Sequence, residues 1–129
     1  MILLDTHIWI WWVQGDPRLD RRISNLLDDS KDPIVVSSIS CWEVAKLAQL
    51  KRVTLPLPPE LWLKVALAFP GVNVVGLTPE IVAESANLPD GFKSDPADEL
   101  IVATARVLNC PLATADRKIV GYPHVTVLK

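Results

Sequence analysis

Short, almost wholly apolar segments alternate with helical patterns from one end of the chain to the other. Segments of this kind are typical of strands buried on both faces, which occur in parallel sheets because the connecting helices cover both sides. The alternation therefore predicts an α/β fold, a three-layer sandwich with a mainly parallel central sheet flanked by helices. The expected strands are Ile2–Leu4, Ile34–Val36, Val72–Val75, Leu112–Thr114 and Val125–Leu128.

Prolines that follow a capping residue mark where helices begin. The clearest signal is Asp95-Pro96, an N-cap with proline at the first helical position, ahead of a pattern that runs to about Asn109. The same signal at Asp16-Pro17 predicts a helix from there to about Leu27. The remaining helices are expected over Ile8–Gln14, from Ser40 to about Leu50, over Leu61–Phe69 and from Thr78 to about Leu88.

Length and composition indicate one globular domain over residues 1–129. Half of the 129 residues are hydrophobic, which excludes a disordered chain and is enough for one core. Five tryptophans all fall within helical patterns, so we expect them in the core or at oligomer contacts rather than stacked on bases. The net charge of −2 argues against broad electrostatic wrapping of nucleic acid, but not against a small nuclease that contacts phosphate through cations.

The compartment follows from the cysteines and from the absence of targeting signals. Cys41 and Cys110 lie far apart and lack zinc-ligand spacing, so we expect two reduced thiols in a cytoplasmic protein. No basic leader precedes the first apolar run, and no apolar run approaches 18 residues. Neither a signal peptide nor a membrane span is expected.

Four acidic residues occupy positions from which they can reach one edge of the predicted sheet. Asp5 and Asp116 follow apolar strands, and Glu43 and Asp98 lie in the first turns of the helices that come later. Ligands bind beyond the carboxyl ends of the strands in an open parallel sheet. We therefore expect these four carboxylates to converge at that edge.

Each acid taken alone also has an ordinary structural role. Asp5 can cap the next helix, and Asp116 can begin a short turn. Ser40 and Glu43 have the spacing of a capping box, and Asp98 stands at the third position of a helix that Asp95 caps. These roles are sufficient for an isolated carboxylate, but not for several that share one buried edge.

Four carboxylates near one buried edge would repel each other, and a divalent cation removes that repulsion. Ligands that are all oxygen suit Mg²⁺ or Mn²⁺. Such a site can bind a scissile phosphate and activate water, which points to a metal-dependent nuclease. His7 and His124 lack zinc-ligand spacing, and we expect His7 to pack on the first helix or to place a polar tip near the site.

Three sequence blocks and the closing strand, in this order, resemble PIN-domain proteins, and among them the VapC-type toxins of bacterial toxin–antitoxin pairs. The blocks are MILLDTHIWIWW, SSISCWEVAKLAQLKRV and DPADELIVATARVLNCPLATADRKI, and the likeness covers essentially the whole chain. It implies a PIN-like three-layer sandwich. The family's four acids fall on Asp5, Glu43, Asp98 and Asp116, and its small hydroxyl residue two places before the last acid falls on Thr114.

The resemblance further implies an endoribonuclease that uses Mg²⁺ or Mn²⁺, forms a homodimer and is inhibited by a small antitoxin. Thr6, Asp95 and Thr114 are secondary site candidates, with Asp95 interpreted first as a helix cap. One departure is Glu99, where such toxins usually have arginine; it can join the metal shell or face solvent. The alternative function is a catalytically weak or inactive PIN-like module that acts by binding a protein partner.

A phosphotransfer enzyme with Asp5 as nucleophile is a weaker alternative. Haloacid-dehalogenase-like enzymes need a second aspartate two places on, where this chain has His7. A phospho-receiver domain would need paired acids before the nucleophile strand and a late lysine, and neither is present.

Overall fold

A parallel sheet of four strands lies at the centre of the computed structural model, which describes all of residues 1–129. Its strands are β1 (Ile2–Leu4), β2 (Ile34–Ser37), β3 (Val72–Val75) and β4 (Leu112–Ala113), arranged in the order β3-β2-β1-β4. Every neighbouring pair is parallel. The predicted α/β class and mainly parallel sheet are therefore confirmed.

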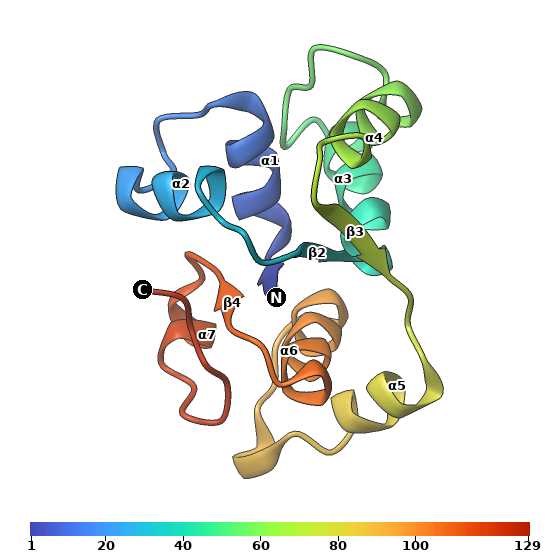
Figure 1. Cartoon of the computed structure of the whole chain (residues 1–129). Helices are drawn as coiled ribbons and strands as arrows, with labels where there is room; N and C mark the ends of the chain where they lie inside the picture. The colour runs from blue at the N-terminus through green and yellow to red at the C-terminus, as the bar shows by residue number, and fades with distance from the viewer.

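Helices connect the strands and cover both faces of the sheet (Figure 1). Figure 1 places α1 to α4 on one side and α5 to α7 on the other. The helices are α1 (Thr6–Gln14), α2 (Arg21–Asp28), α3 (Ser38–Gln49), α4 (Pro59–Leu67), α5 (Pro79–Ser85), α6 (Pro96–Leu108) and α7 (Arg117–Val120), with a 3₁₀ turn over Pro89–Gly91. None of them is long and apolar enough to cross a bilayer.

Successive side chains of β1 point to opposite faces of the sheet, and the core accordingly forms two clusters, one on each face. Ile2 and Leu4 pack against α1 to α4 in a cluster that includes the buried Trp9. Leu3 points the other way and packs with Ile101 of α6. This is the three-layer arrangement that the sequence predicts, because side chains of a strand alternate between its two faces.

The helix expected after Asp16-Pro17 begins later than predicted. α2 starts at Arg21 and is capped by Asp20, whose side chain accepts a hydrogen bond from the Arg22 amide. The carboxylate of Asp16 is instead occupied by Arg18, with which it forms a salt bridge. The intervening turn carries the buried Leu19 into the core before the helix begins.

The predicted fifth strand, Val125–Leu128, is wrong in extent. Only one parallel bridge forms there, between Leu112 and Val127. The neighbouring strand, β4, is the edge strand on that side and has only two residues. It is therefore too short to pair with a longer fifth strand.

Because both core clusters share β1, we propose that residues 1–129 form one domain that unfolds as a unit. Leu4→Ala removes a fully buried side chain and should lower the free energy of unfolding by about 2–5 kcal/mol. Leu57→Ala, at a position that is 39% exposed, is the matched control and should change it little. Urea denaturation followed by circular dichroism measures both variants. Two separate transitions in the unaltered chain would contradict the single unit.

Candidate metal centre at the carboxyl end of the sheet

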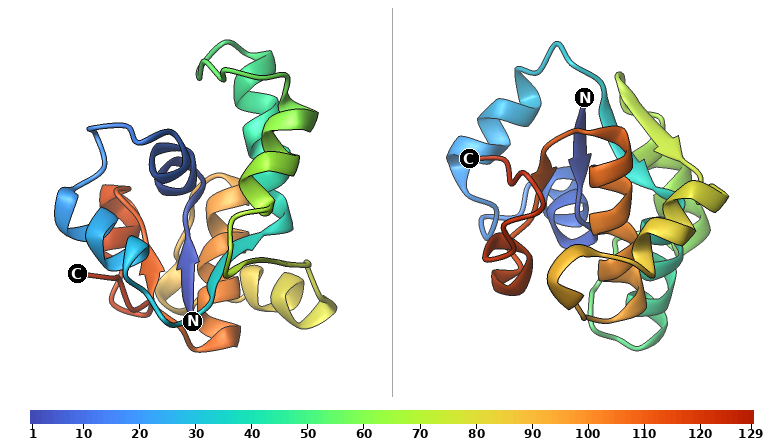
Figure 2. Two further views of the ribbon diagram at one scale, coloured as in Figure 1. Left: turned by 45° about the horizontal axis from the view of Figure 1, so that its top comes forward. Right: turned by 90° about the horizontal axis from the view of Figure 1, so that it is seen from below.

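A cavity of about 300 Å³ opens beyond the carboxyl ends of the strands, and five carboxylates line it. In the left view of Figure 2, β1 runs from the N-terminus into α1, at the end of the sheet where the cavity lies. The carboxylates come from four separate segments of the chain, which the parallel sheet brings to one edge. The cavity-lining residues are Asp5, His7, Trp11, Glu43, Asp95, Asp98, Ala115 and Asp116.

Asp5 is the most deeply buried of these acids, with 7% of its surface exposed. It follows β1 directly and caps α1, where its Oδ1 accepts a hydrogen bond from the Thr6 amide at 2.8 Å. Its Oδ2 accepts a hydrogen bond from Thr114 Oγ1 at 2.6 Å. Burial raises the pKa of the Asp5 carboxyl, and the hydrogen bonds from Thr114 and Thr6 act in the opposite direction.

Glu43 reaches the cavity from the second turn of α3. The sequence predicts Glu43 in the first turn, but α3 begins earlier, at Ser38, with Ser37 as its cap. The alternative role of Glu43 in a capping box with Ser40 is therefore excluded. Ser40 instead shares a hydrogen bond with Thr6, whose hydroxyl also contacts Glu43 Oε1 at 2.5 Å. The side chain of Glu43 is therefore free of a capping role and is oriented toward the acids by Thr6.

The pKa of Glu43 is raised to about 7. Burial is the main cause, and the carboxylates of Asp5, Asp95 and Asp98 raise it further, while the Thr6 hydrogen bond lowers it. Mutual electrostatic repulsion of this kind requires the acids to be close together. The contribution of the three neighbouring carboxylates to the pKa of Glu43 therefore follows from their gathering in one cavity.

Asp98 occupies the third position of α6, and Asp95 caps the helix as predicted by accepting a hydrogen bond from the Asp98 amide at 2.9 Å. Asp98 Oδ2 accepts a hydrogen bond from Ser94 Oγ at 2.7 Å. Burial raises the pKa of Asp98 to about 6, with further increases from the carboxylates of Asp95, Asp5 and Asp116. Asp95 thus combines its capping role with a place on the cavity wall.

Asp116 caps α7, and its Oδ1 accepts hydrogen bonds from the amides of Lys118 and Ile119. Its own amide donates to Thr114 Oγ1 at 3.1 Å. Because the same hydroxyl donates to Asp5, Thr114 connects the first and last acids of the chain. Sequence reasoning placed Thr114 near the site, and the structure gives it this positioning contact.

The four predicted acids thus share one cavity, but no three of them gather tightly enough to form a ready-made ion cage. This arrangement fits a small, strongly hydrated cation. Mg²⁺ usually keeps several waters and binds through one or two carboxylates rather than in an all-protein cage. The donor set is entirely oxygen, it is partly buried, and its carboxylates repel one another, so the residues fit a divalent metal.

Glu99 lies outside this set. Its carboxylate accepts a hydrogen bond from the Ser94 amide at 3.0 Å, and the side chain does not line the cavity. Glu99 therefore orders the loop that carries Ser94, which is itself a partner of Asp98. Sequence reasoning missed Ser94, because nothing in its spacing distinguishes it from a loop serine.

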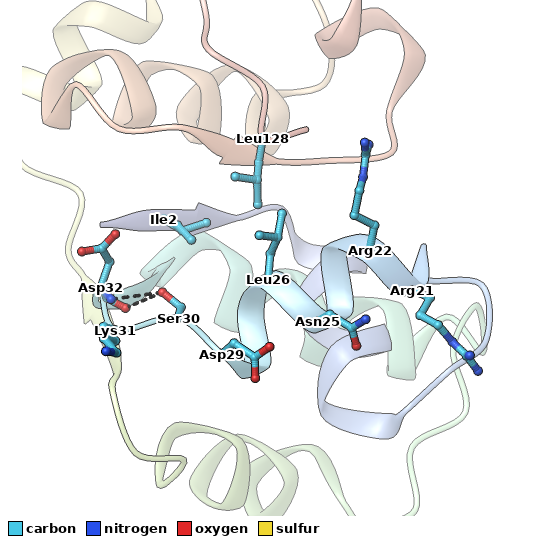
Figure 3. A pocket seen from close by; sticks show the side chains of 10 residues that line it. All are labelled: Ile2, Arg21, Arg22, Asn25, Leu26, Asp29, Ser30, Lys31, Asp32 and Leu128. Atoms are coloured by element: carbon cyan, nitrogen blue, oxygen red, sulfur yellow. Dashed lines mark hydrogen bonds between the residues drawn. The ribbon is translucent and has the colours of Figure 1, made fainter.

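A larger cavity of about 660 Å³ lies elsewhere, between α2 and the C-terminal segment (Figure 3). Figure 3 shows Ile2, Leu26 and Leu128 near its middle, with Arg21 and Arg22 on the right and Lys31 and Asp32 on the left. It lies toward the amino end of β1, at the end of the sheet opposite the five acids of the smaller cavity. Although this cavity is the larger of the two, it is not the candidate catalytic site.

Comparison with known proteins identifies the family to which this fold belongs. The sequence matches the PIN domain family over residues 2–124. A relative, Ribonuclease VapC22 of Mycobacterium tuberculosis, is 37% identical over 123 residues, which are 95% of this chain and 92% of the relative. The chain belongs to the PIN domain family.

Solved structures have the same PIN fold. A toxin–antitoxin complex from Klebsiella pneumoniae contains a chain with a TM-score of 0.71 and 24% identity, and the match covers 100% of this chain and 97% of that one. VapBC2 from Rickettsia felis, bound to a DNA fragment from its promoter, gives a TM-score of 0.73 and 19% identity, covering 99% and 98%. At these identities the two structures support the PIN fold alone.

The PIN-domain acids determine how stability should depend on pH when metal is absent. A raised carboxyl pKa means that the folded state holds its proton more tightly than the unfolded chain. The metal-free protein should therefore lose stability as pH rises from about the ordinary value of 4.5 to the folded value of about 7 for Glu43. Its melting temperature should be higher at pH 5 than at pH 7.5, and Glu43→Gln should flatten this decline.

Glu80→Gln is the matched control, because Glu80 is exposed at the start of α5 and lies outside the acidic cavity. Differential scanning fluorimetry in the presence of EDTA measures the three proteins. An unchanged pH profile in Glu43→Gln would show that the pKa of the Glu43 carboxyl is not raised in the folded protein.

Proposed function

We propose that this PIN-domain chain is a divalent-metal-dependent endoribonuclease that hydrolyses RNA phosphodiester bonds and acts as the toxin of a toxin–antitoxin pair. The observation that supports it most directly is the cavity into which four segments of the chain each bring a carboxylate. The 37% identity to a protein named as a ribonuclease supports the same activity.

In this proposal Asp5, Glu43, Asp98 and Asp116 hold Mg²⁺ or Mn²⁺, and Asp95 contacts the hydrated ion. A bound divalent ion supplies positive charge for the scissile phosphate and lowers the pKa of a water molecule. Hydrogen bonds from neutral hydroxyls fix the carboxylates that hold it. The donors are Thr6 to Glu43, Thr114 to Asp5 and Ser94 to Asp98.

The proposed antitoxin has a suitable docking groove beside the acids. A second cavity of about 470 Å³ shares Glu43 and Asp95 with the acidic cavity. Apolar side chains line much of it, and two of them are strongly exposed, Trp42 at 57% and Leu50 at 51%. An amphipathic antitoxin segment that covers this groove would reach the carboxylates and block access to them, as the resemblance to VapC-type toxins implies.

The proposal also includes a homodimer and a cytoplasmic location. Leu61 and Val65 of α4 lie one turn apart and are 48% and 51% exposed, which gives α4 an apolar outer face. α4 packs beside α3 on the side of the sheet that also carries the tryptophan-rich α1, and its outer face is the proposed dimer surface.

The alternative, a PIN-like module that binds a partner without cleaving RNA, is favoured by one observation. Glu99 stands where the VapC-type toxins that this chain resembles usually have arginine, so an acid replaces a positive charge near the site. The two functions differ in whether metal addition produces cleavage that depends on the cavity acids.

Removal of any cavity acid should abolish cleavage. Asp5→Asn, Glu43→Gln and Asp98→Asn each keep the size of the side chain but remove a charge that binds metal. Removal of an outer partner of a metal ligand typically costs roughly 10–100-fold in activity. Because these residues are the proposed ligands themselves, each substitution should reduce the cleavage rate by more than that. The assay is hydrolysis of labelled RNA with Mn²⁺, and EDTA should stop it in the unaltered protein.

Asp29→Asn is the control, since Asp29 is exposed at the end of α2 and outside the acidic cavity. It should cleave like the unaltered chain. Equal cleavage by Asp5→Asn, or cleavage that resists EDTA, would remove the metal mechanism. No cleavage by the unaltered chain with either metal would favour the partner-binding alternative.

Thr114→Val tests the positioning contact. The substitution preserves shape but removes the hydroxyl that contacts both Asp5 and the Asp116 amide. Activity or metal affinity should fall by about 10–100-fold, and Thr114→Ser should restore much of it. Full activity in Thr114→Val would show that Asp5 keeps its orientation without this bond.

A further inference from the structure

One wall of the acidic cavity is aromatic. His7 and Trp11 lie one turn apart on α1 and line the cavity together with the acids. Their ring centroids are 6.0 Å apart, with planes at 60°. Trp9, on another side of the same helix, is fully buried, whereas His7 is exposed and Trp11 is half-buried. The expectation of a core or oligomer role is therefore incomplete for Trp11, which also faces the site.

A cation lies over this aromatic wall. The guanidinium carbon of Arg18 is 5.4 Å from the centre of the Trp11 ring. Asp16 holds the guanidinium through Nε at 3.1 Å and Nη2 at 2.7 Å. The Arg18 side chain is nevertheless 70% exposed, so its remaining edge is available to an anion from solution.

The backbone fixes this arrangement before any ligand arrives. Gly15 ends α1 in the left-handed region, at φ 63°, and its amide bonds back to the helix. The Asp16 amide then donates to the carbonyl oxygen of Trp11 at 2.9 Å. The hydrogen bonds and charge of Arg18 lower the pKa of the Asp16 carboxyl, which keeps the pair ionised. Asp16 thus connects Arg18 to the backbone of Trp11, the residue whose ring the guanidinium covers.

The fold gives little reason for such an arrangement. The Arg18–Asp16 pair is exposed, and pairs of this kind contribute little to stability. Nucleic acids, by contrast, match each part of it. Bases stack on aromatic side chains whatever their sequence, and a guanidinium binds phosphate oxygens with good geometry. The cavity itself is lined by five carboxylates. His7, Trp11 and Arg18 therefore provide the surface beside it that can contact RNA without a metal.

We propose that His7, Trp11 and Arg18 form a nucleotide-binding shelf that positions the nucleotide next to the scissile phosphate. The base lies against His7 and Trp11, and its phosphate contacts Arg18. The inference rests on the proposed ribonuclease function and adds a substrate class. A base within a duplex has both faces stacked, so the nucleotide on the shelf must be unpaired and the substrate single-stranded at that point.

Equilibrium binding tests the shelf separately from cleavage. The probe is a fluorescein-labelled, single-stranded RNA octamer of mixed sequence. Anisotropy is measured in Ca²⁺, which neutralises the carboxylates, and a denaturing gel verifies that the octamer stays intact. Trp11→Leu should weaken binding by about 5- to 150-fold, the range for loss of one stacked base, and Trp11→Phe should keep most of the affinity. Trp12→Leu is the matched control, because Trp12 is on the same helix but outside the cavity.

The salt dependence isolates the role of Arg18. Arg18→Ala should weaken binding and reduce the slope of log affinity against log salt by about 0.7, the value for one phosphate contact on a single strand. Arg21→Ala removes the same charge from a site toward the other end of the sheet, and should leave the slope unchanged. Trp11→Leu should weaken binding with no change in slope, because an indole carries no charge.

The outcomes separate the shelf from the proposed function. If the unaltered chain fails to bind the octamer, or if folded Trp11→Leu and Arg18→Ala bind as tightly as the controls, the shelf is wrong. The shelf is equally wrong if double-stranded RNA of the same length shows the same dependence on Trp11. If binding depends on these residues but no RNA is cleaved with Mn²⁺ or Mg²⁺, the shelf stands and the ribonuclease proposal fails.

Discussion

Mutual repulsion among carboxylates at one edge of a parallel sheet is the constraint on which this structure depends. Parallel strands send all their carboxyl ends to the same side, so the residues that follow them meet regardless of their separation in sequence. Here Asp5 and Asp116 come from neighbouring strands, and Glu43 and Asp98 reach the same cavity from helices. Burial raises the pKa values of Glu43 and Asp98, and the neighbouring carboxylates raise them further through this repulsion. A divalent cation in the cavity would relieve it.

Neutral hydroxyls make that concentration of charge tolerable in the absence of an ion. Thr6, Ser94 and Thr114 each donate a hydrogen bond to a different acid. These carboxylates are therefore oriented without a lysine or arginine side chain. No lysine or arginine lines the cavity. This leaves its charge uncompensated and keeps it suited to a hydrated metal. The positive charge of Arg18 lies outside it, over Trp11, where it can contact substrate.

Most of the fold could be predicted from the sequence, because buried strands and proline-marked helix starts are local signals. The four acids could be proposed for the same reason, since each follows a recognisable strand or cap. Contacts between distant segments could not. Ser40 has capping-box spacing with Glu43, but Thr6 on another helix bonds to both. Asp16-Pro17 has the helix-start signal, but Arg18 takes the carboxylate. Trp11 was missed although its spacing from His7, one turn along α1, places both on one face.

A crystal structure of the protein soaked in Mn²⁺, with anomalous scattering recorded near the manganese edge, tests the central claim most directly. The account predicts a manganese peak within the cavity, bound by at least one of Asp5, Glu43, Asp98 and Asp116 directly and by others through water. An empty cavity at millimolar Mn²⁺, or a peak only at other carboxylates such as Asp28 and Asp29, would contradict it.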